Sequence, residues 1–214
     1  MLTLTPHTDS IHVLCLGAHP DDIEIGCGGT MLGLAERPGT RFTSLVLTGD
    51  DQREQESTKA LQRLAPHIET HFARLIDGRL PAQWQETKDA LERLGADCRP
   101  DVIFAPRVDD AHQDHRLVGQ LASTVWRDAV ILHYEIAKWD GDMGAPNTFV
   151  GLSVAHAREK VDVLNACFPS QVDREWWDDE AFLGLMRLRG IECRAQYAEA
   201  FYSSKLLLDL GTGG

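Results

Sequence analysis

Hydrophobic and polar residues alternate along this chain in blocks of two kinds. Short apolar runs, rich in Val, Ile, Leu and Phe, are separated by longer segments in which apolar residues recur with helical spacing. The apolar runs cover 11–17, 42–47, 71–76, 101–105 and 130–135, and the helical segments lie near 29–36, 53–65, 82–95 and 115–127. Strands and helices that alternate in this way form βαβ units around a parallel sheet buried on both faces. The pattern predicts an α/β fold, a Rossmann-like three-layer sandwich with a mostly parallel sheet.

The pattern loosens after residue 136. Glycine, proline and asparagine are frequent up to residue 148, which predicts a long loop, and a short strand over 149–152 follows. Helices are expected over 154–167 and near 179–190, and the leucines at 206–208 are expected to pack back on the core. Loops this long in a compact domain usually carry function. We expect one domain, 1–214, in which the C-terminal segment from about 137 lines the pocket and sets specificity.

The charge of the chain argues against several classes of partner. Its formal net charge is −12 and no cluster of Lys and Arg stands out, so we expect no nucleic-acid partner, because such proteins need basic patches. No apolar stretch approaches the roughly 20 residues of a membrane span, and the first residues lack the features of a secretory leader. The five cysteines form no CxxC pair and are expected to be reduced. These features predict a cytoplasmic protein with a neutral or cationic small-molecule substrate.

Candidate chemistry follows two of the predicted strands. The first apolar run is followed by Ala18-His19-Pro20-Asp21-Asp22 and then by a glycine-rich segment, 26–30, which is typical of a strand-to-helix turn. The fourth run is followed in the same way by Asp110-Ala111-His112-Gln113-Asp114-His115. Open α/β sheets bind ligands at the carboxyl ends of their strands. Both clusters would therefore face one crevice, provided that the order of the strands brings those two ends together.

A metal site accounts for these residue types. A catalytic zinc needs three protein ligands and an open position, and two histidines with one carboxylate form an established set. His19 and Asp22 lie across one turn, and His115 supplies the third ligand from the other cluster. Fe(II) or another divalent metal suits the same ligands. The sequence therefore predicts a metal centre, with zinc as the first choice.

The remaining acidic and imidazole groups of the two clusters are candidates for proton transfer. Asp21 is left beside the metal without coordinating it, which makes it the candidate general base. His112 is the candidate group for stabilising an oxyanion and for protonating a leaving amine. We expect Asp110 or Asp114 to hold the ring of His112 in its charged form through a hydrogen bond.

Other interpretations of the same residues stay open at this point. A His-Pro-Asp-Asp sequence alone is compatible with an ordinary turn that caps a helix. The glycine segment is also compatible with a phosphate cradle, but it lacks the GxGxxG spacing, and Asp21 and Asp22 would repel a pyrophosphate. Cys27 is interpreted as a small buried residue rather than a ligand. Of the histidines outside the clusters, His133 is a candidate only for lining the pocket.

These motifs resemble those of the LmbE-like, or PIG-L, family of zinc-dependent N-acetylglucosaminyl deacetylases. That family carries an AHPDD motif after the first strand and a later HxDH motif, which match 18–22 and 112–115 here. The similarity extends to Arg53, to Asp77-Gly78 and to the segment 197–201, so it covers nearly the whole chain. One departure is that many members carry a glutamate directly after the two aspartates, where this chain has Ile23 followed by Glu24.

The resemblance implies the same zinc ligands, general base and oxyanion donor as the residues themselves suggest. It adds Arg53 and Asp77 as contacts to the substrate and makes a homo-oligomer an expectation. We therefore expect a metal-dependent hydrolase that removes the N-acetyl group of an amino-sugar conjugate of the N-acetylglucosamine type. One alternative is an amidase that acts on another amide, such as a thiol conjugate. Another is a non-catalytic nucleotide-sugar-binding module, which nucleotides would stabilise against melting.

Overall fold

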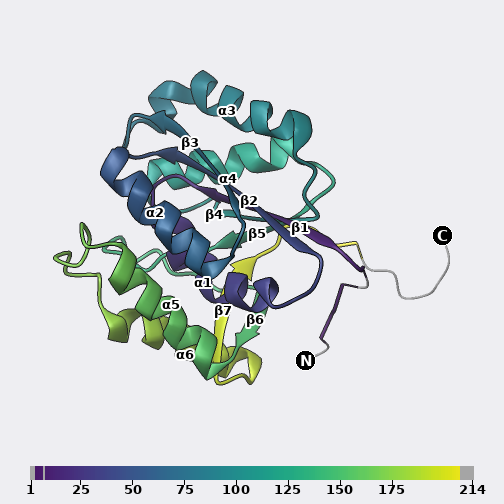
Figure 1. Cartoon of the computed structure of the whole chain (residues 1–214), viewed down its shortest axis with the longest axis vertical. Helices are drawn as coiled ribbons and strands as arrows, with labels where there is room; N and C mark the ends of the chain where they lie inside the picture. Colours follow the sequence, from purple (N-terminus) through teal and green to yellow (C-terminus); the bar gives the residue numbers. More distant parts are fainter. Residues whose placement is uncertain (1–2, 7, 208–214) are drawn as a thin grey trace.

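The strands of the protein form one mostly parallel sheet (Figure 1). The structure, a computed structural model, describes residues 3–6 and 8–207. Within these ranges the sheet has seven strands in the order β3-β2-β1-β4-β5-β7-β6, in which β7 runs antiparallel to β5 and β6 and the others are parallel. The strands are β1 Ile11–Gly17, β2 Thr40–Thr48, β3 Glu69–Leu75, β4 Val102–Pro106, β5 Val130–Tyr134, β6 Thr148–Leu152 and β7 Tyr197–Tyr202.

Helices cover both faces of this sheet and complete the predicted three-layer α/β sandwich. One core cluster joins the sheet to α3 and α4, and a second joins its other face to α1, α2, α5 and α6 (Figure 1). The helices are α1 Asp22–Ala35, α2 Asp51–Leu64, α3 Trp84–Asp97, α4 Gln113–Val125, α5 Val154–Cys167 and α6 Asp179–Cys193, and a short 3₁₀ helix covers Leu80–Gln83. In the part of the chain that the structure describes, no helix has both the length and the apolar character needed to cross a membrane.

The central strand β1 shows why the sheet is covered on both sides. Val13 and Cys15 point into the core beneath α1, whereas Leu14 and Leu16 point into the core beneath α3 and α4, and none of the four is accessible to solvent. A strand with two buried faces reads as a continuous apolar run, as this one does. Because β1 pairs with β4 as well as with β2, the carboxyl ends of β1 and β4 are neighbours.

The glycine-rich segment differs from its sequence-based interpretation. It is not a strand-to-helix turn, because α1 begins at Asp22 and includes residues 26–30, with a local break at Cys27. The turn between β1 and α1 consists of the motif residues 18–21. Glu24 also lies inside α1, where it is fully buried and accepts a hydrogen bond from Ser57 Oγ at 2.7 Å. Burial raises the pKa of Glu24 to about 8.

The sequence predicts that the leucines at 206–208 pack back on the core. This prediction is wrong for the two of them that the structure describes. Leu206 is 50% exposed and Leu207 is 99% exposed, so neither packs on the core, and Leu208 lies outside the described residues. The last strand of the chain is β7, which lies between β5 and β6 and pairs with both. Its residues Ala198 and Ala200 are buried. The place beside β5 is therefore taken by β7, and Leu206 and Leu207 remain exposed to solvent.

Candidate metal centre

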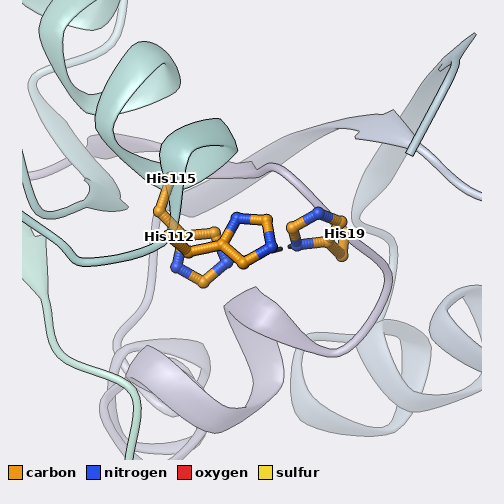
Figure 2. Close-up of side chains that lie close together, drawn as sticks. All are labelled: His19, His112 and His115. Carbon is orange, nitrogen blue, oxygen red and sulfur yellow. Dashed lines mark hydrogen bonds between the residues drawn. The ribbon is translucent and has the colours of Figure 1, made fainter. Parts of the chain in front are cut away.

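Both sequence motifs lie at the carboxyl ends of neighbouring strands. His19, Asp21 and Asp22 occupy the connection from β1 into α1, and His112 and His115 lie at the start of α4, behind β4. Because β4 pairs directly with β1, the imidazole rings of both motifs come together (Figure 2). The ring centroid of His19 lies 4.8 Å from that of His112 and 5.1 Å from that of His115. The strand order thus supplies the juxtaposition that the sequence left open.

The donor groups of His19, Asp22 and His115 form a compact triangle, in which Asp22 faces each imidazole with a different carboxylate oxygen. His19 Nδ1 lies 3.2 Å from His115 Nε2 and 3.4 Å from Asp22 Oδ2, and His115 Nε2 lies 3.2 Å from Asp22 Oδ1. Ligand atoms at about 2.0–2.2 Å from a tetrahedral zinc lie roughly 3.3–3.5 Å from one another. The spacing and chemistry of these three residues therefore fit a shared divalent metal ion.

The backbone of the same turn fixes the carboxylate of Asp22. The N–H groups of Ala18 and His19 donate to Asp22 Oδ2 at 2.9 and 2.8 Å. Burial alone would favour the neutral acid, but His115 and His19 outweigh it and hold the pKa of Asp22 well below its usual range. The result is an ionised carboxylate that presents its other oxygen to His115.

Carboxylates lie behind both imidazole rings of the triangle. His19 Nε2 lies 3.3 Å from Asp114 Oδ2, and His115 Nδ1 lies 3.2 Å from Asp110 Oδ2. A carboxylate on the far nitrogen is the usual partner of a metal-binding histidine, because it fixes the orientation of the ring and raises its basicity. Asp114 and Asp110 are completely or almost completely buried, which strengthens both contacts.

The contacts of Asp110 and Asp114 correct one expectation from the sequence. Their carboxylates do not hold the ring of His112 but face the rings of His115 and His19. The carboxylate of Asp114 is drawn away from His112 because it accepts the N–H groups of Gly78 and Leu80 at 2.8 and 3.1 Å. Toward His112, Asp110 accepts only the backbone N–H, at 2.8 Å.

His112 caps α4 and lines the same cavity as the triangle. Its Nδ1 accepts the N–H of Asp114 at 3.3 Å, so a neutral ring carries its proton on Nε2. Burial lowers the pKa of His112, and the neighbouring rings of His115 and His19 lower it further. The nitrogens of the three histidines lie within 4.8 Å of one another, but Asp22 contacts both other rings more closely. Asp22 is therefore the better third ligand, and His112 Nε2–H is left as a donor.

Asp21 lies beside the triangle in an unusual backbone conformation. Its φ of 111° is rare for a residue other than glycine, and such strain is found mainly at functional sites. Asp21 Oδ2 accepts a hydrogen bond from Arg53 Nη2 at 2.8 Å, and Arg53 also donates to the carbonyl of Pro20. Burial raises the pKa of Asp21 to about 7, although Arg53 opposes this shift. Asp21 therefore places a second carboxylate directly beside the candidate ligand Asp22.

A cavity of about 200 Å³ opens in front of these groups. Arg53 and Asp77, the predicted substrate contacts, both line it, and Asp77 Oδ1 also lies 3.1 Å from His19 Nε2. A larger cavity of about 450 Å³ lies between β1–β3 and α3, but it contains none of the motif residues. The donor groups rather than the volume therefore identify the candidate site.

The sequence predicts that the segment from about 137 lines the pocket, but it does not single out the side chains that do so. The loop after β5 and the connection between α5 and α6 supply this part of the cavity wall, and their residues carry no motif that would mark them. The lining residues from these two segments include Lys138, Trp139, Asp140, Gln171, Arg174 and Trp176.

The fold and the donor set define an α/β protein with a candidate His/Asp metal centre at the carboxyl edge of its sheet. A family model described as PIG-L, GlcNAc-PI de-N-acetylase, matches residues 14–126, which is more than half of the chain. The chain belongs to this family, and the resemblance noted in its sequence is confirmed. The match includes every residue of both motifs.

Individual relatives agree with this assignment. The chain is 35% identical to the uncharacterized deacetylase YaiS of Escherichia coli (strain K12) over 136 residues, which are 58% of this chain and 72% of YaiS. It resembles the conserved protein TT1542 from Thermus thermophilus, with a TM-score of 0.75 and 25% identity over 95% of this chain and 99% of that one. It also shares its fold with the N,N'-diacetylchitobiose deacetylase from Pyrococcus horikoshii, with a TM-score of 0.69 and 22% identity over 91% and 84% of the two chains.

Proposed function

We propose that this protein is a metal-dependent hydrolase that removes the N-acetyl group from an amino-sugar conjugate of the N-acetylglucosamine type. The triangle of His19, Asp22 and His115 donor groups, whose atoms approach one another to 3.2, 3.2 and 3.4 Å, is the observation that carries this proposal. Membership of a de-N-acetylase family and the similarity to a named deacetylase support the reaction class. The reaction consumes one water and cleaves the amide C–N bond to give acetate and a free amine.

Zinc is the metal that we propose for this centre, held by His19, Asp22 and His115. When bound, it would polarise the acetyl carbonyl and lower the pKa of a coordinated water to about 7. Fe(II) or another divalent metal suits the same ligands, because metal availability decides occupancy as much as affinity does. Asp114 and Asp110 keep the two imidazoles in the orientation that binding requires.

Asp21 carries the proton in the proposed mechanism. Its carboxylate is buried next to Asp22, and Arg53 orients it through a hydrogen bond to Oδ2. Asp21 takes a proton from the attacking water and gives it to the amine nitrogen as the C–N bond breaks, so the carboxylate returns to its starting state. The Arg53 contact restricts the side chain to the direction of the cavity, which both residues line.

His112 stabilises the negative charge that develops on the acetyl oxygen. The Nδ1 of His112 is occupied by the N–H of Asp114, so the ring can present only Nε2–H to the cavity. A donor fixed in this way needs no reorganisation as charge develops, which is the source of its effect on the rate. Asp114 thus acts twice, through its backbone on His112 and through its carboxylate on His19.

The substrate lies in the cavity in front of these groups in this proposal. Arg53 and Asp77 contact the sugar hydroxyls, and Trp139 forms an aromatic wall with Trp176, whose ring centroid is 6.1 Å away. These two tryptophans belong to the C-terminal segment, from about 137, of the single domain 1–214. We assign recognition of the conjugated group to this segment, because His19, Asp22 and His115 would act on the acetyl group.

Replacing Trp139 should weaken substrate binding and leave the chemical step intact. Trp139 is 66% exposed, and covering part of its indole with a sugar face would contribute about 1 kcal/mol. Trp139→Ala should therefore raise KM roughly fivefold at unchanged kcat, which steady-state assays of acetate release would measure. Trp84→Ala is a matched control, because Trp84 is 47% exposed at the start of α3 and does not line the cavity. An unchanged KM in Trp139→Ala would exclude this wall from recognition.

A comparison of substrates tests the proposed function against its alternatives. The zinc-loaded protein should release acetate from N-acetylglucosamine conjugates faster than it hydrolyses amides of thiol conjugates. The opposite preference would assign the same centre to a different amide. Failure with every amide, together with a higher melting temperature on addition of nucleotide sugars, would favour the binding module.

A further inference from the structure

A buried ion pair interrupts helix α1 directly behind the candidate metal centre. Cys27 has the non-helical angles φ −142° and ψ 15°, which divide α1 into a short first piece, beginning at Asp22, and a longer second piece. Lys160 of α5 and Glu199 of β7 lie against this break, with 2.7 Å between Lys160 Nζ and Glu199 Oε1. Each residue is only 4% exposed, so both charges are inside the protein.

The ion pair replaces one hydrogen bond of the helix. In an uninterrupted helix the N–H of Gly29 would donate to the carbonyl of Ile25. Here the N–H of Gly29 donates to Glu199 Oε1 at 2.8 Å, and the carbonyl of Ile25 accepts Lys160 Nζ. The N–H of Thr30 donates to Glu199 Oε2 at 2.7 Å, so the same carboxylate caps the second piece of the helix. The N–H groups of Gly29 and Thr30 and the carbonyl of Ile25 thus each have a charged partner at the break.

The glycines of this segment allow the close packing that the break requires. A Cβ at Gly29 would lie 2.6 Å from Leu152 Cδ1 and 3.1 Å from Glu199 Oε1, and a Cβ at Gly26 would overlap the ring of Tyr134. The hydroxyl of Tyr134 in turn donates to the carbonyl of Leu16 in β1, at 2.7 Å. The first piece of α1 is therefore held between the sheet on one side and the ion pair at its end.

From these contacts we infer that Lys160 and Glu199 are positioning residues for the metal centre. They fix the direction of the first piece of α1 and thereby aim the carboxylate of Asp22 at His115, 3.2 Å away. Ile25 connects the ion pair with the metal centre. Lys160 donates to the carbonyl of Ile25, and Ile25 also lines the cavity in front of the metal ligands. Lys160 and Glu199 act through the backbone of α1 and not on the ligands themselves. The inference rests on the proposed metal site.

Zinc affinity and thermal stability distinguish positioning from simple stabilisation. Glu199→Gln keeps the size of the side chain, but it leaves Lys160 without a counter-ion and places an amide N–H₂ against a backbone N–H. The variant should melt at a lower temperature, because a buried charge is left unpaired. Its zinc affinity, measured by competition with a chelator, should fall about 10- to 100-fold, as expected when the support of a metal ligand is lost.

The double variant Lys160→Met/Glu199→Gln separates the two effects. It contains no unpaired buried charge, so its melting temperature should recover towards that of the wild type. Its zinc affinity should stay low, because the Lys160–Glu199 pair no longer links the carbonyl of Ile25 to the N–H of Gly29. Glu135→Gln is a matched control, since it breaks the buried pair of Glu135 and Arg189, whose closest atoms are 2.6 Å apart, without removing a hydrogen bond to α1. This control should lower the melting temperature and keep the zinc affinity.

Two outcomes would overturn the inference. The first is a double variant that binds zinc as tightly as the wild type does. This result would overturn the inference and leave the proposed function intact. If the wild type binds no divalent metal, the proposed function fails, and a crystal structure of the double variant then tests the inference separately. A continuous α1 with Asp22 displaced from His115 would support the inference. An unchanged break at Cys27 is the second outcome that would overturn it.

Discussion

Asp21→Asn should abolish most of the turnover while the protein keeps its metal. Asparagine has almost the same size and can still accept the hydrogen bond of Arg53, but it cannot take a proton from water. The value of kcat should therefore fall about 10²- to 10⁴-fold, the usual contribution of a general base. Acetate release measures the rate, and elemental analysis of the same sample measures the zinc content, which should not change.

A carboxylate outside the cavity serves as the control for this variant. Asp109 has a side chain that is 70% exposed and pairs with Arg107, so Asp109→Asn should have wild-type kcat and wild-type zinc content. A near-normal rate in Asp21→Asn would show that another group removes the proton. Loss of zinc in Asp21→Asn would instead place Asp21 among the ligands, contrary to the role proposed for it.

His115→Ala should lose the metal. His115 supplies one corner of the donor triangle, 3.2 Å from Asp22 Oδ1, and its side chain is buried. The wild type should hold about one equivalent of zinc per chain, and the variant much less, because a site with two protein ligands binds weakly. Acetate release should fall to the background rate in the same sample.

A second buried histidine provides a control for the loss of His115. His133 is 5% exposed, its Nδ1 is hydrogen-bonded to the carbonyl of Pro106 at 2.8 Å, and it does not line the cavity. His133→Ala should destabilise the fold but bind zinc as the wild type does. Full zinc content in His115→Ala would remove His115 from the ligand set and leave the group of His19, Asp77 and Asp114 as the remaining candidate.

The parallel part of the fold was predictable because its signal is local. Each buried parallel strand shows a continuous apolar run, and β1 was predicted with its observed bounds, Ile11–Gly17. β7 was missed as a strand because Glu199 interrupts its apolar residues. Glu199 accepts hydrogen bonds from the backbone N–H groups of Gly29 and Thr30 in α1, which is far away in the sequence. No local pattern can reveal such a partner.

The metal centre was predictable in its residue types but not in its network of contacts. His19, Asp22 and His115 were found because both motifs follow apolar runs and combine imidazole with carboxylate. The partners of Asp110 and Asp114 could not be deduced, because they depend on how α4 is rotated against the turn after β3.

For the outer wall of the cavity the sequence predicts a segment, from about 137, but not the individual side chains. Arg174 and Trp176 belong to a connection between helices that tertiary packing alone brings to the mouth of the site. Their segment has neither a periodic pattern nor a cluster of metal-binding residue types.

Acetate release before and after removal of the metal tests the central claim most directly. The purified protein would be assayed with an N-acetylglucosamine conjugate as isolated, after treatment with a chelator, and after zinc is added back. The account predicts acetate and free amine in equal amounts, loss of both on chelation, and recovery with zinc. Acetate release that is indifferent to chelation, or no release by the zinc-loaded protein from any N-acetyl amino sugar, would contradict it.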